Sequence, residues 1–178
     1  HELAAGLYHN TLMSNRGAKA LGYLKTRGIS IDSIKRFKVG FAPESSKFLF
    51  NAVKSERFER ETYEKSGLFG GSSSDFYDRF RSRIMFPIWN TSSKVVGFGG
   101  RVFASDDPAK YMNSPETPLY KKSDIFYGLH SARESIREKK YAILVEGYTD
   151  IIKLYQSGVH NCVAVSGTAF SARHASQM

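Results

Sequence analysis

The 178-residue sequence has a single cysteine, Cys162, and no long apolar run. One cysteine forms neither an internal disulfide nor a thiolate zinc site, so the sequence excludes both and fits a reducing, cytoplasm-like setting. A membrane span needs about 18 consecutive apolar residues, and no stretch approaches that length. No basic segment followed by an apolar one opens the chain. We therefore expect no signal peptide and no membrane partner.

Three common catalytic or nucleotide-binding motifs are also missing. The chain has no Gly-x-Gly-x-x-Gly that opens a helix after a strand, and no Gly-x-x-x-x-Gly-Lys-Ser/Thr loop. Ser166 precedes a glycine, but no Gly-x-Ser-x-Gly elbow surrounds it. These absences argue against a dinucleotide-binding domain, a P-loop enzyme and a serine hydrolase.

Acidic residues are too few to balance the basic ones. Lys and Arg total 26 against 17 Asp and Glu, which gives a net charge of +9. A surplus of this size favours a polyanionic partner, nucleic acid first, because cations on a surface attract phosphates. A basic domain without such a partner is the alternative.

Residues 141–150 are the stretch around which the rest is organised. A mostly apolar run ends at the carboxylate of Glu146, as in a strand buried on both faces of a parallel sheet. A helix over about 150–157, capped by Thr149 or Asp150, and a second strand over 162–165 should follow. The pattern predicts a parallel strand–helix–strand unit.

The ends of these two strands carry the candidate chemistry. Ligands bind beyond the carboxyl ends of parallel strands, where Glu146 and Gly167-Thr168 both fall. Glu146 and Asp150 are four residues apart and can face one cleft, where they could hold a divalent cation or transfer a proton. The alternatives are an exposed loop acid at Glu146 and a helix cap at Asp150, and for Asp150 the cap is favoured.

Upstream, the periodicity predicts a mixed α and β segment. A hairpin is expected from strands over 83–88 and 94–101, whose three glycines require either a close approach by another group or a bulged, twisted strand. Residues 39–43 should be extended, 67–74 a flexible loop, and 110–122, with two prolines, an ordered loop. Helical spacing of apolar residues occurs over 2–13, 17–27, 31–37, 46–55, 57–66 and near 129–139.

Several blocks, in this order, resemble the catalytic core of bacterial DNA primase, which lays RNA primers on single-stranded DNA. The Glu-Gly-Tyr-x-Asp signature that opens the TOPRIM domain matches residues 146–150, and its Gly-Thr loop matches 167–168. The other matching blocks are Arg-Phe-Arg-x-Arg-x-Met-Phe-Pro-Ile at 79–88, Gly-Phe-Gly-Gly-Arg at 97–101, Tyr-x-Asn-Ser-Pro-Glu-Thr at 111–117 and Tyr-Leu-x-x-Arg-Gly at 23–28.

The resemblance implies an α+β, or mixed α/β, fold in two parts. Residues 1–139 would form the N-terminal subdomain of the catalytic core, and 140–178 the start of TOPRIM as a parallel strand–helix–strand unit, with a basic template groove between them. Glu146 would be the catalytic metal ligand and Asp150 a weaker one. The nucleotide and template path would use Arg27, Arg81, Arg101, Lys110, Asn113, Lys122, Gly167 and Thr168.

The same resemblance implies cofactors and partners. The metal would be Mg²⁺ or Mn²⁺, with Zn²⁺ only in a preceding module, and the later Asp-x-Asp metal motif would lie beyond Met178. We therefore expect a fragment of a longer protein that is inactive by itself. Partners would be a single-stranded DNA template, NTPs, the RNA primer and, through a following domain, a replicative helicase. The chain would be monomeric and act at the bacterial replisome in the cytoplasm.

Two other functions stay open at this stage. One is a TOPRIM strand-cleaving enzyme of the topoisomerase or nuclease kind, which would need a nucleophilic tyrosine elsewhere. The other is a non-catalytic single-stranded-DNA-binding module, suggested by the +9 charge and the 13% aromatic content.

Overall fold

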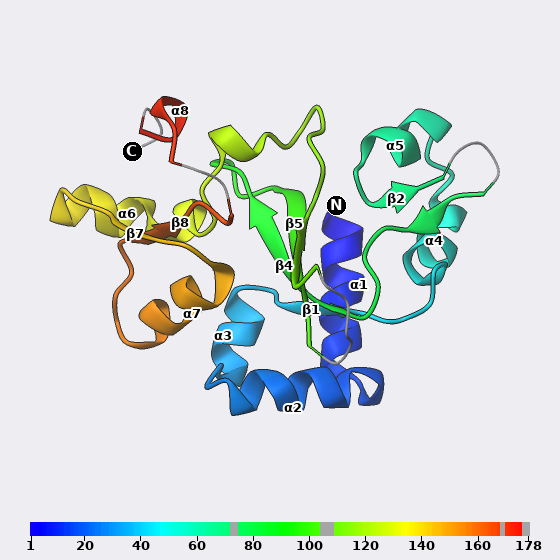
Figure 1. Ribbon diagram of the computed structural model, residues 1–178, viewed down its shortest axis with the longest axis horizontal. Helices are drawn as coiled ribbons and strands as arrows, with labels where there is room; N and C mark the ends of the chain where they lie inside the picture. Colours follow the sequence, from blue (N-terminus) through cyan, green and yellow to red (C-terminus); the bar gives the residue numbers. More distant parts are fainter. Residues whose placement is uncertain (72–74, 104–108, 168–169, 176–178) are drawn as a thin grey trace.

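A computed structural model describes residues 1–71, 75–103, 109–167 and 170–175. A central antiparallel sheet runs in the order β1-β4-β5-β6, and helices and smaller sheets surround it (Figure 1). Its strands are β1 (Gly40–Ala42), β4 (Arg83–Trp89), β5 (Val95–Val102) and β6 (Tyr111–Asn113).

The β4–β5 hairpin is confirmed, with its register shifted at Ile88/Trp89. The glycines of β5 allow side chains from other elements to approach the strand closely. A Cβ atom on Gly99 would lie 2.2 Å from Cζ of Tyr148, and one on Gly97 would lie 3.1 Å from the ring of Tyr120. The approaching groups are aromatic rings, and this explains why the strand tolerates residues that usually weaken it.

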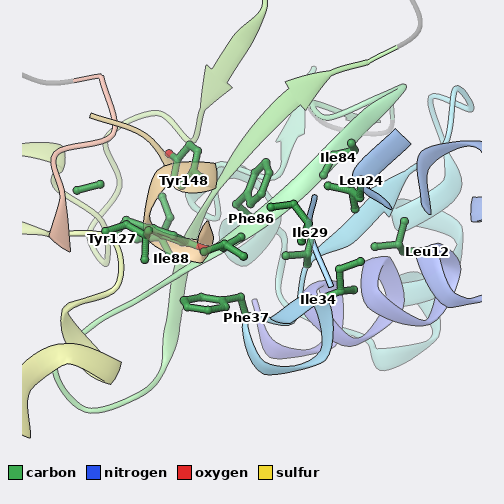
Figure 2. Packing of buried hydrophobic residues seen from close by; sticks show 14 of the residues in the cluster. Leu12, Leu24, Ile29, Ile34, Phe37, Ile84, Phe86, Ile88, Tyr127 and Tyr148 are labelled. Atoms are coloured by element: carbon green, nitrogen blue, oxygen red, sulfur yellow. The ribbon is translucent and has the colours of Figure 1, made fainter. Parts of the chain in front are cut away.

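Three predicted helices pack on the lower edge of this sheet. They are α1 (Glu2–Met13), α2 (Ala18–Thr26) and α3 (Ile31–Arg36), and the hydroxyl of Ser30 caps α3 by accepting from the Ser33 amide at 3.2 Å. Figure 2 shows their side chains meeting β4 in one core, which contains Leu12, Leu24, Ile29, Ile34, Ile84 and Phe86.

A separate lobe on the other side of α1 contains α4 (Phe48–Val53), α5 (Arg60–Lys65) and a small antiparallel pair, β2 (Phe69–Gly70) and β3 (Tyr77–Asp78) (Figure 1). Phe50, Tyr63, Phe69 and Phe76 form its aromatic core. The prediction of a loop over 67–74 was wrong for Phe69 and Gly70, because the Phe69 ring belongs to this core and draws its backbone into a strand. Residues 72–74 lie outside the described part of the chain.

The predicted parallel strand–helix–strand unit is confirmed. It comprises β7 (Ile143–Val145), α7 (Tyr148–Gln156) and β8 (Cys162–Ala164), with Ile143 opposite Cys162. The helices α6 (Leu129–Lys139) and α8 (Ala172–Ala175) lie beside it (Figure 1). Short 3₁₀ helices complete the fold: η1 (Asn15–Gly17), η2 (Lys54–Glu56) and η3 (Lys122–Asp124).

Two details of this unit differ from the sequence expectation. The helix α7 begins at Tyr148 rather than near residue 150, because the Tyr148 ring packs into the core. The strand β7 is not buried on both faces, since Leu144 is 43% exposed. The helix α6 packs against Val163 of β8, and no described element covers Leu144.

The segment 110–122 was expected to be a loop throughout. Part of it is instead the strand β6, which extends the central sheet.

The core is continuous between the sheet and the strand–helix–strand unit. Tyr127 and Ala164 exchange two backbone hydrogen bonds, at 2.9 and 3.0 Å. Tyr148, Ile151 and Cys162 belong to the same buried cluster as Phe86 and Ile88 of β4. The two parts therefore hold each other in a defined arrangement.

Candidate functional site

A polar cavity of about 700 Å³ lies where β7 and β8 end beside β5 and β6. Its acidic wall is the turn from β7 into α7, and its basic wall comes from the end of α2, from β5 and from the start of β6. Seven of the predicted site residues line it: Arg27, Arg101, Lys110, Asn113, Glu146, Asp150 and Gly167. The cavity lies at the sheet edge where the sequence led us to expect a ligand site.

The two carboxylates of the cavity differ in the hydrogen bonds that they accept. Glu146 is exposed just after β7, and its backbone carbonyl accepts from the Ser166 amide at 3.1 Å. Asp150 is also exposed, but Oδ2 accepts from the Gly147 amide at 3.1 Å. The predicted capping role of Asp150 is therefore present, at the third residue of α7 rather than at the position before the helix.

These two acids are the candidate ligands of the expected metal ion. The described residues contain no group of three or more His, Cys, Asp or Glu side chains suited to a metal ion. Glu146 and Asp150 nevertheless offer carboxylate oxygens in one cavity that also holds cations. A Mg²⁺-like ion is often bound by one or two carboxylates together with substrate phosphates, so the donors present fit part of such a site.

Arg101 is the most buried cation of the cavity, at 6% exposure. Its guanidinium lies between the rings of Tyr23 and Tyr111, at 5.1 and 5.6 Å, and donates to the Tyr23 hydroxyl. Within the described residues, its buried Nε has no hydrogen-bond partner. These contacts of the buried cation, all within the described part of the chain, are with neutral tyrosines, which leaves part of its desolvation cost uncompensated. An anionic ligand would offset that cost.

Arg27, Lys110 and Tyr111 line the open side of the same cavity and are exposed. The ion pairs found in the described parts of the chain involve other cations, namely Lys38, Lys47, Arg60 and Lys65. The positive charge of the cavity is therefore available to a ligand. Tyr111 is 44% exposed and presents an aromatic surface beside Lys110.

A hydrogen-bonded chain joins the two walls. The Tyr148 hydroxyl donates to Oδ1 of Asn113 at 2.6 Å, and Nδ2 of Asn113 donates to the Ser166 carbonyl at 2.8 Å. The Tyr148 ring is 2% exposed and stacks on Phe86 at 5.1 Å with an interplanar angle of 6° (Figure 2). Burial raises the pKa of the Tyr148 phenol well above its usual value, so the hydroxyl remains protonated and can donate.

Three predicted site residues do not line the cavity or cannot be placed. Arg81 is exposed, with its guanidinium 6.0 Å from the centre of the Tyr77 ring. Lys122 is half-buried, and its backbone bonds to Glu116 and His174 at 3.0 and 3.1 Å. Thr168 lies outside the described residues.

Three tyrosines of the site were missed as functional residues. Tyr23 and Tyr111 flank Arg101, and Tyr148 connects the walls. A tyrosine next to a basic residue, as at Lys110-Tyr111, was a usable signal for a nucleic-acid surface. The sequence offered no comparable signal for the contact between Tyr148 and Asn113.

A second cavity, of about 380 Å³, lies far from these residues between α1, α4, α5 and Leu119. Its lining is mostly apolar, with Phe58, Leu68 and Phe69 among the residues. The described residues that line this second cavity do not include two carboxylates beside cations that lack an ion-pair partner. The polar cavity is therefore the better candidate for the functional site.

Comparisons with known proteins identify relatives for both parts of the chain. The family model of the DNA primase catalytic core, N-terminal domain, matches residues 7–133, and that of the Toprim domain matches 140–178. A curated DNA primase of Staphylococcus epidermidis is 40% identical over 177 residues. That match covers 98% of this chain and 29% of the relative, so the chain spans less than a third of the length of such relatives.

Solved structures give the same similarity. The RNA polymerase domain of Mycobacterium tuberculosis primase DnaG superposes with a TM-score of 0.91 at 38% identity, covering 98% of this chain and 57% of that one. A DnaG primase catalytic domain bound to ssDNA has a TM-score of 0.88 at 36% identity, covering 98% and 54%.

Proposed function

The chain belongs to the DNA primase catalytic-core family, and from this premise we propose that its polar cavity is part of the site of RNA primer synthesis on single-stranded DNA. The family match and the curated primase relatives support a nucleotidyltransferase, that is, an RNA polymerase activity. The observation that carries the proposal is the convergence of Glu146 and Asp150 with Arg27, Arg101 and Lys110 in one cavity.

The reaction explains why acids and cations meet there. In nucleotidyl transfer, the 3′-hydroxyl oxygen of the primer bonds to the α-phosphorus of an NTP. The bond from that phosphorus to the bridging oxygen breaks, pyrophosphate leaves, and the hydroxyl proton goes to a base. Arg101 and Lys110 neutralise and position the triphosphate, since phosphoryl transfer depends mainly on positioning and charge stabilisation. Arg27 lies on the same basic wall and holds a backbone phosphate of the template.

Glu146 and Asp150 are the residues that would hold the divalent cation, which we propose to be Mg²⁺ or Mn²⁺. When bound, such an ion supplies charge neutralisation at the reacting phosphates. Glu146 is exposed and well placed to contact both an ion and the reacting groups. Asp150 is the weaker ligand, because one of its oxygens already accepts from the Gly147 amide.

The template surface combines charge with an aromatic ring. Tyr111 is exposed beside Lys110, and such a pair suits a single strand, whose bases stack on rings while its phosphates meet cations. A structural neighbour is described as bound to ssDNA, which supports this assignment. Asn113, Lys122, Gly167 and Thr168 are proposed to follow the nucleotide path, and Arg81 an outer part of the template path.

The wider setting follows from the family and is also proposed. We assign 1–139 and 140–178 as the two structural units, consistent with the matched ranges 7–133 and 140–178. The complete protein would act as a monomer at the bacterial replication fork in the cytoplasm, with a zinc-binding module and a contact to the replicative helicase supplied by other domains. No helix among the described residues is long and apolar enough to cross a membrane.

The decisive test is Glu146→Gln in the complete protein. Primer synthesis from NTPs on single-stranded DNA, with Mg²⁺ or Mn²⁺, should fall by about a hundredfold or more, as expected when a metal-binding carboxylate is neutralised. Glu134→Gln, an exposed glutamate on α6, is the matched control and should keep normal activity. Full activity of the Glu146 variant would refute its catalytic role.

A single-stranded-DNA-binding module without catalysis is the second candidate, because Arg101 and Tyr111 would serve it equally well. It predicts DNA binding by the complete protein with no primer synthesis under any metal condition. Strand cleavage by the complete protein, with no primers made, would instead favour a TOPRIM nuclease or topoisomerase.

A further inference from the structure

The hydrogen-bonded chain between the cavity walls suggests a role that none of the motifs defines. Gly99 of β5 pairs directly with Asn113 of β6, and the Tyr148 ring lies against Gly99 in the space where a side chain would otherwise be. This position lets the Tyr148 hydroxyl reach Oδ1 of Asn113. A bulkier residue than glycine at position 99 would block that contact.

The orientation of the Asn113 amide is determined by its partners. Its Nδ2 faces the Ser166 carbonyl, which can only accept, so Oδ1 must face Tyr148. The Ser166 amide in turn donates to the Glu146 carbonyl. Three consecutive hydrogen bonds therefore run from Tyr148 to the backbone of the acid, at 2.6, 2.8 and 3.1 Å.

Tyr148 is also only two residues from Glu146 along the chain. The turn that carries the acid is thus held at both sides, by the packed ring of Tyr148 and by the Ser166 amide. Ser166 has a φ of 52°, in the left-handed region, which a non-glycine residue adopts only when its surroundings hold it there.

We propose that Tyr148 and Asn113 are positioning residues that fix Glu146 relative to the basic wall of Arg101 and Lys110. They act through the Ser166 backbone, and this action requires no bound nucleotide. The chain of hydrogen bonds uses one of the two N–H donors of Asn113, so the other remains for the nucleotide path proposed above. The activity part of this inference rests on the proposed function, whereas its structural part does not.

The test compares two tyrosines in the same aromatic cluster of the complete protein. Tyr148→Phe removes only the hydroxyl that donates to Asn113. Tyr127→Phe is the matched control: its ring meets that of Tyr148 at 4.7 Å, and its buried hydroxyl has no hydrogen-bond partner in the described part of the chain. Hydrogen–deuterium exchange of residues 162–167 should become about fivefold faster in Tyr148→Phe and remain unchanged in Tyr127→Phe. Equal exchange in the two variants would overturn the proposal.

Primer synthesis gives an independent readout. In Tyr148→Phe we expect kcat to fall about tenfold, with KM for NTPs and the Kd for single-stranded DNA within about twofold of the unmodified values. Asn113→Ala should cause a similar fall in kcat, and the kcat of the double variant should be no lower than that of the more impaired single one. Multiplicative losses, or an equal loss in Tyr127→Phe, would refute a shared positioning role. If the unmodified protein makes no primers, the proposed function fails, and the exchange comparison still decides whether the contact positions the turn.

Discussion

Replacing Gly99 with alanine tests the packing on which the cavity depends. The added Cβ would lie 2.2 Å from Cζ and 2.5 Å from the hydroxyl of Tyr148. Real Cβ atoms do not approach other atoms so closely, so the ring must leave its place between Gly99, Phe86 and Tyr127. The change therefore acts on the folded state, at the junction of β5 and α7.

The expected loss of folding stability follows from the contacts that the Tyr148 ring would lose. Overpacking costs about 1–3 kcal/mol, the hydrogen bond to Asn113 contributes about 1 kcal/mol, and the aromatic pair with Phe86 contributes about 0.5–1.5 kcal/mol. Because relaxation of one part relieves another, we expect a loss of roughly 2–4 kcal/mol. In a domain of this size, that loss lowers the unfolding midpoint by about 5–15 °C.

Gly22→Ala is the matched control for this substitution. Gly22 lies inside α2, is exposed, and has no atom within 4 Å of the position of an added Cβ. Alanine there should stabilise the protein by about 0.5–1 kcal/mol, because glycine is a poor helix former. Calorimetric unfolding of both variants measures the difference. An unfolding midpoint of Gly99→Ala equal to that of the unmodified protein would refute the close packing of Tyr148 on β5.

Two further predictions concern binding and pH. Arg27→Ala should weaken single-stranded DNA binding and lower the slope of log K against log salt by about one, since one contact with a template phosphate is lost. Lys54→Ala on the distant lobe should leave that slope unchanged, and an unchanged slope for Arg27→Ala would contradict its assignment to the template. His130 packs against Trp89 at 4.4 Å, and burial, with a smaller effect of the Arg36 charge, lowers the pKa of His130 from 6.5 to about 4. The folded pKa lies below the unfolded one, so the stability contributed by neutral His130 is complete above pH 6.5 and is lost as the pH falls toward 4. His130→Gln should reduce the acid sensitivity of the unfolding midpoint in that window, and an identical pH profile would refute it.

The sequence predicted the parts of the site that depend on local chain direction. A strand that ends in a carboxylate, followed by a helix and a second strand, is enough to place Glu146 and Gly167 at one sheet edge. The sequence also predicted the hairpin of β4 and β5, from strand-like runs over 83–88 and 94–101 and the turn between them. Arg101 was expected in the site only from the family resemblance, because no local pattern shows that the end of β5 faces the strand–helix–strand unit.

The parts that the sequence did not reveal depend on contacts between distant segments. Among the arginines of the block at 79–88, Arg83 is the buried one, and it donates to the carbonyls of Gly100 and Ala109. Arg81 is exposed to solvent. Strict alternation along an extended chain would place Arg79, Arg81 and Arg83 on one face. The strand β4 begins only at Arg83, and Ser82 has a φ of 51°, so the chain bends between Arg81 and Arg83 and the two side chains have different surroundings. The contact of Tyr148 with Asn113 spans 35 residues and requires a glycine at position 99 of another element, β5. No local sequence pattern predicts that combination.

The helix α7 connects the acidic and the basic walls at both of its ends. At its start, Tyr148 is bound to Asn113 of β6. At its end, Gln156 accepts from the Ser30 amide and donates to the Gly28 carbonyl, both at 2.9 Å, directly beside Arg27. The separation of Glu146 from Arg27 is thereby tied to the length of one rigid helix. The separation of Glu146 from Lys110 and Arg101 is tied to the partly buried hydrogen bond between Tyr148 and Asn113. A ligand that needs an acid on one side and cations on the other therefore finds those distances already set before it binds, which lowers the cost of ordering the site.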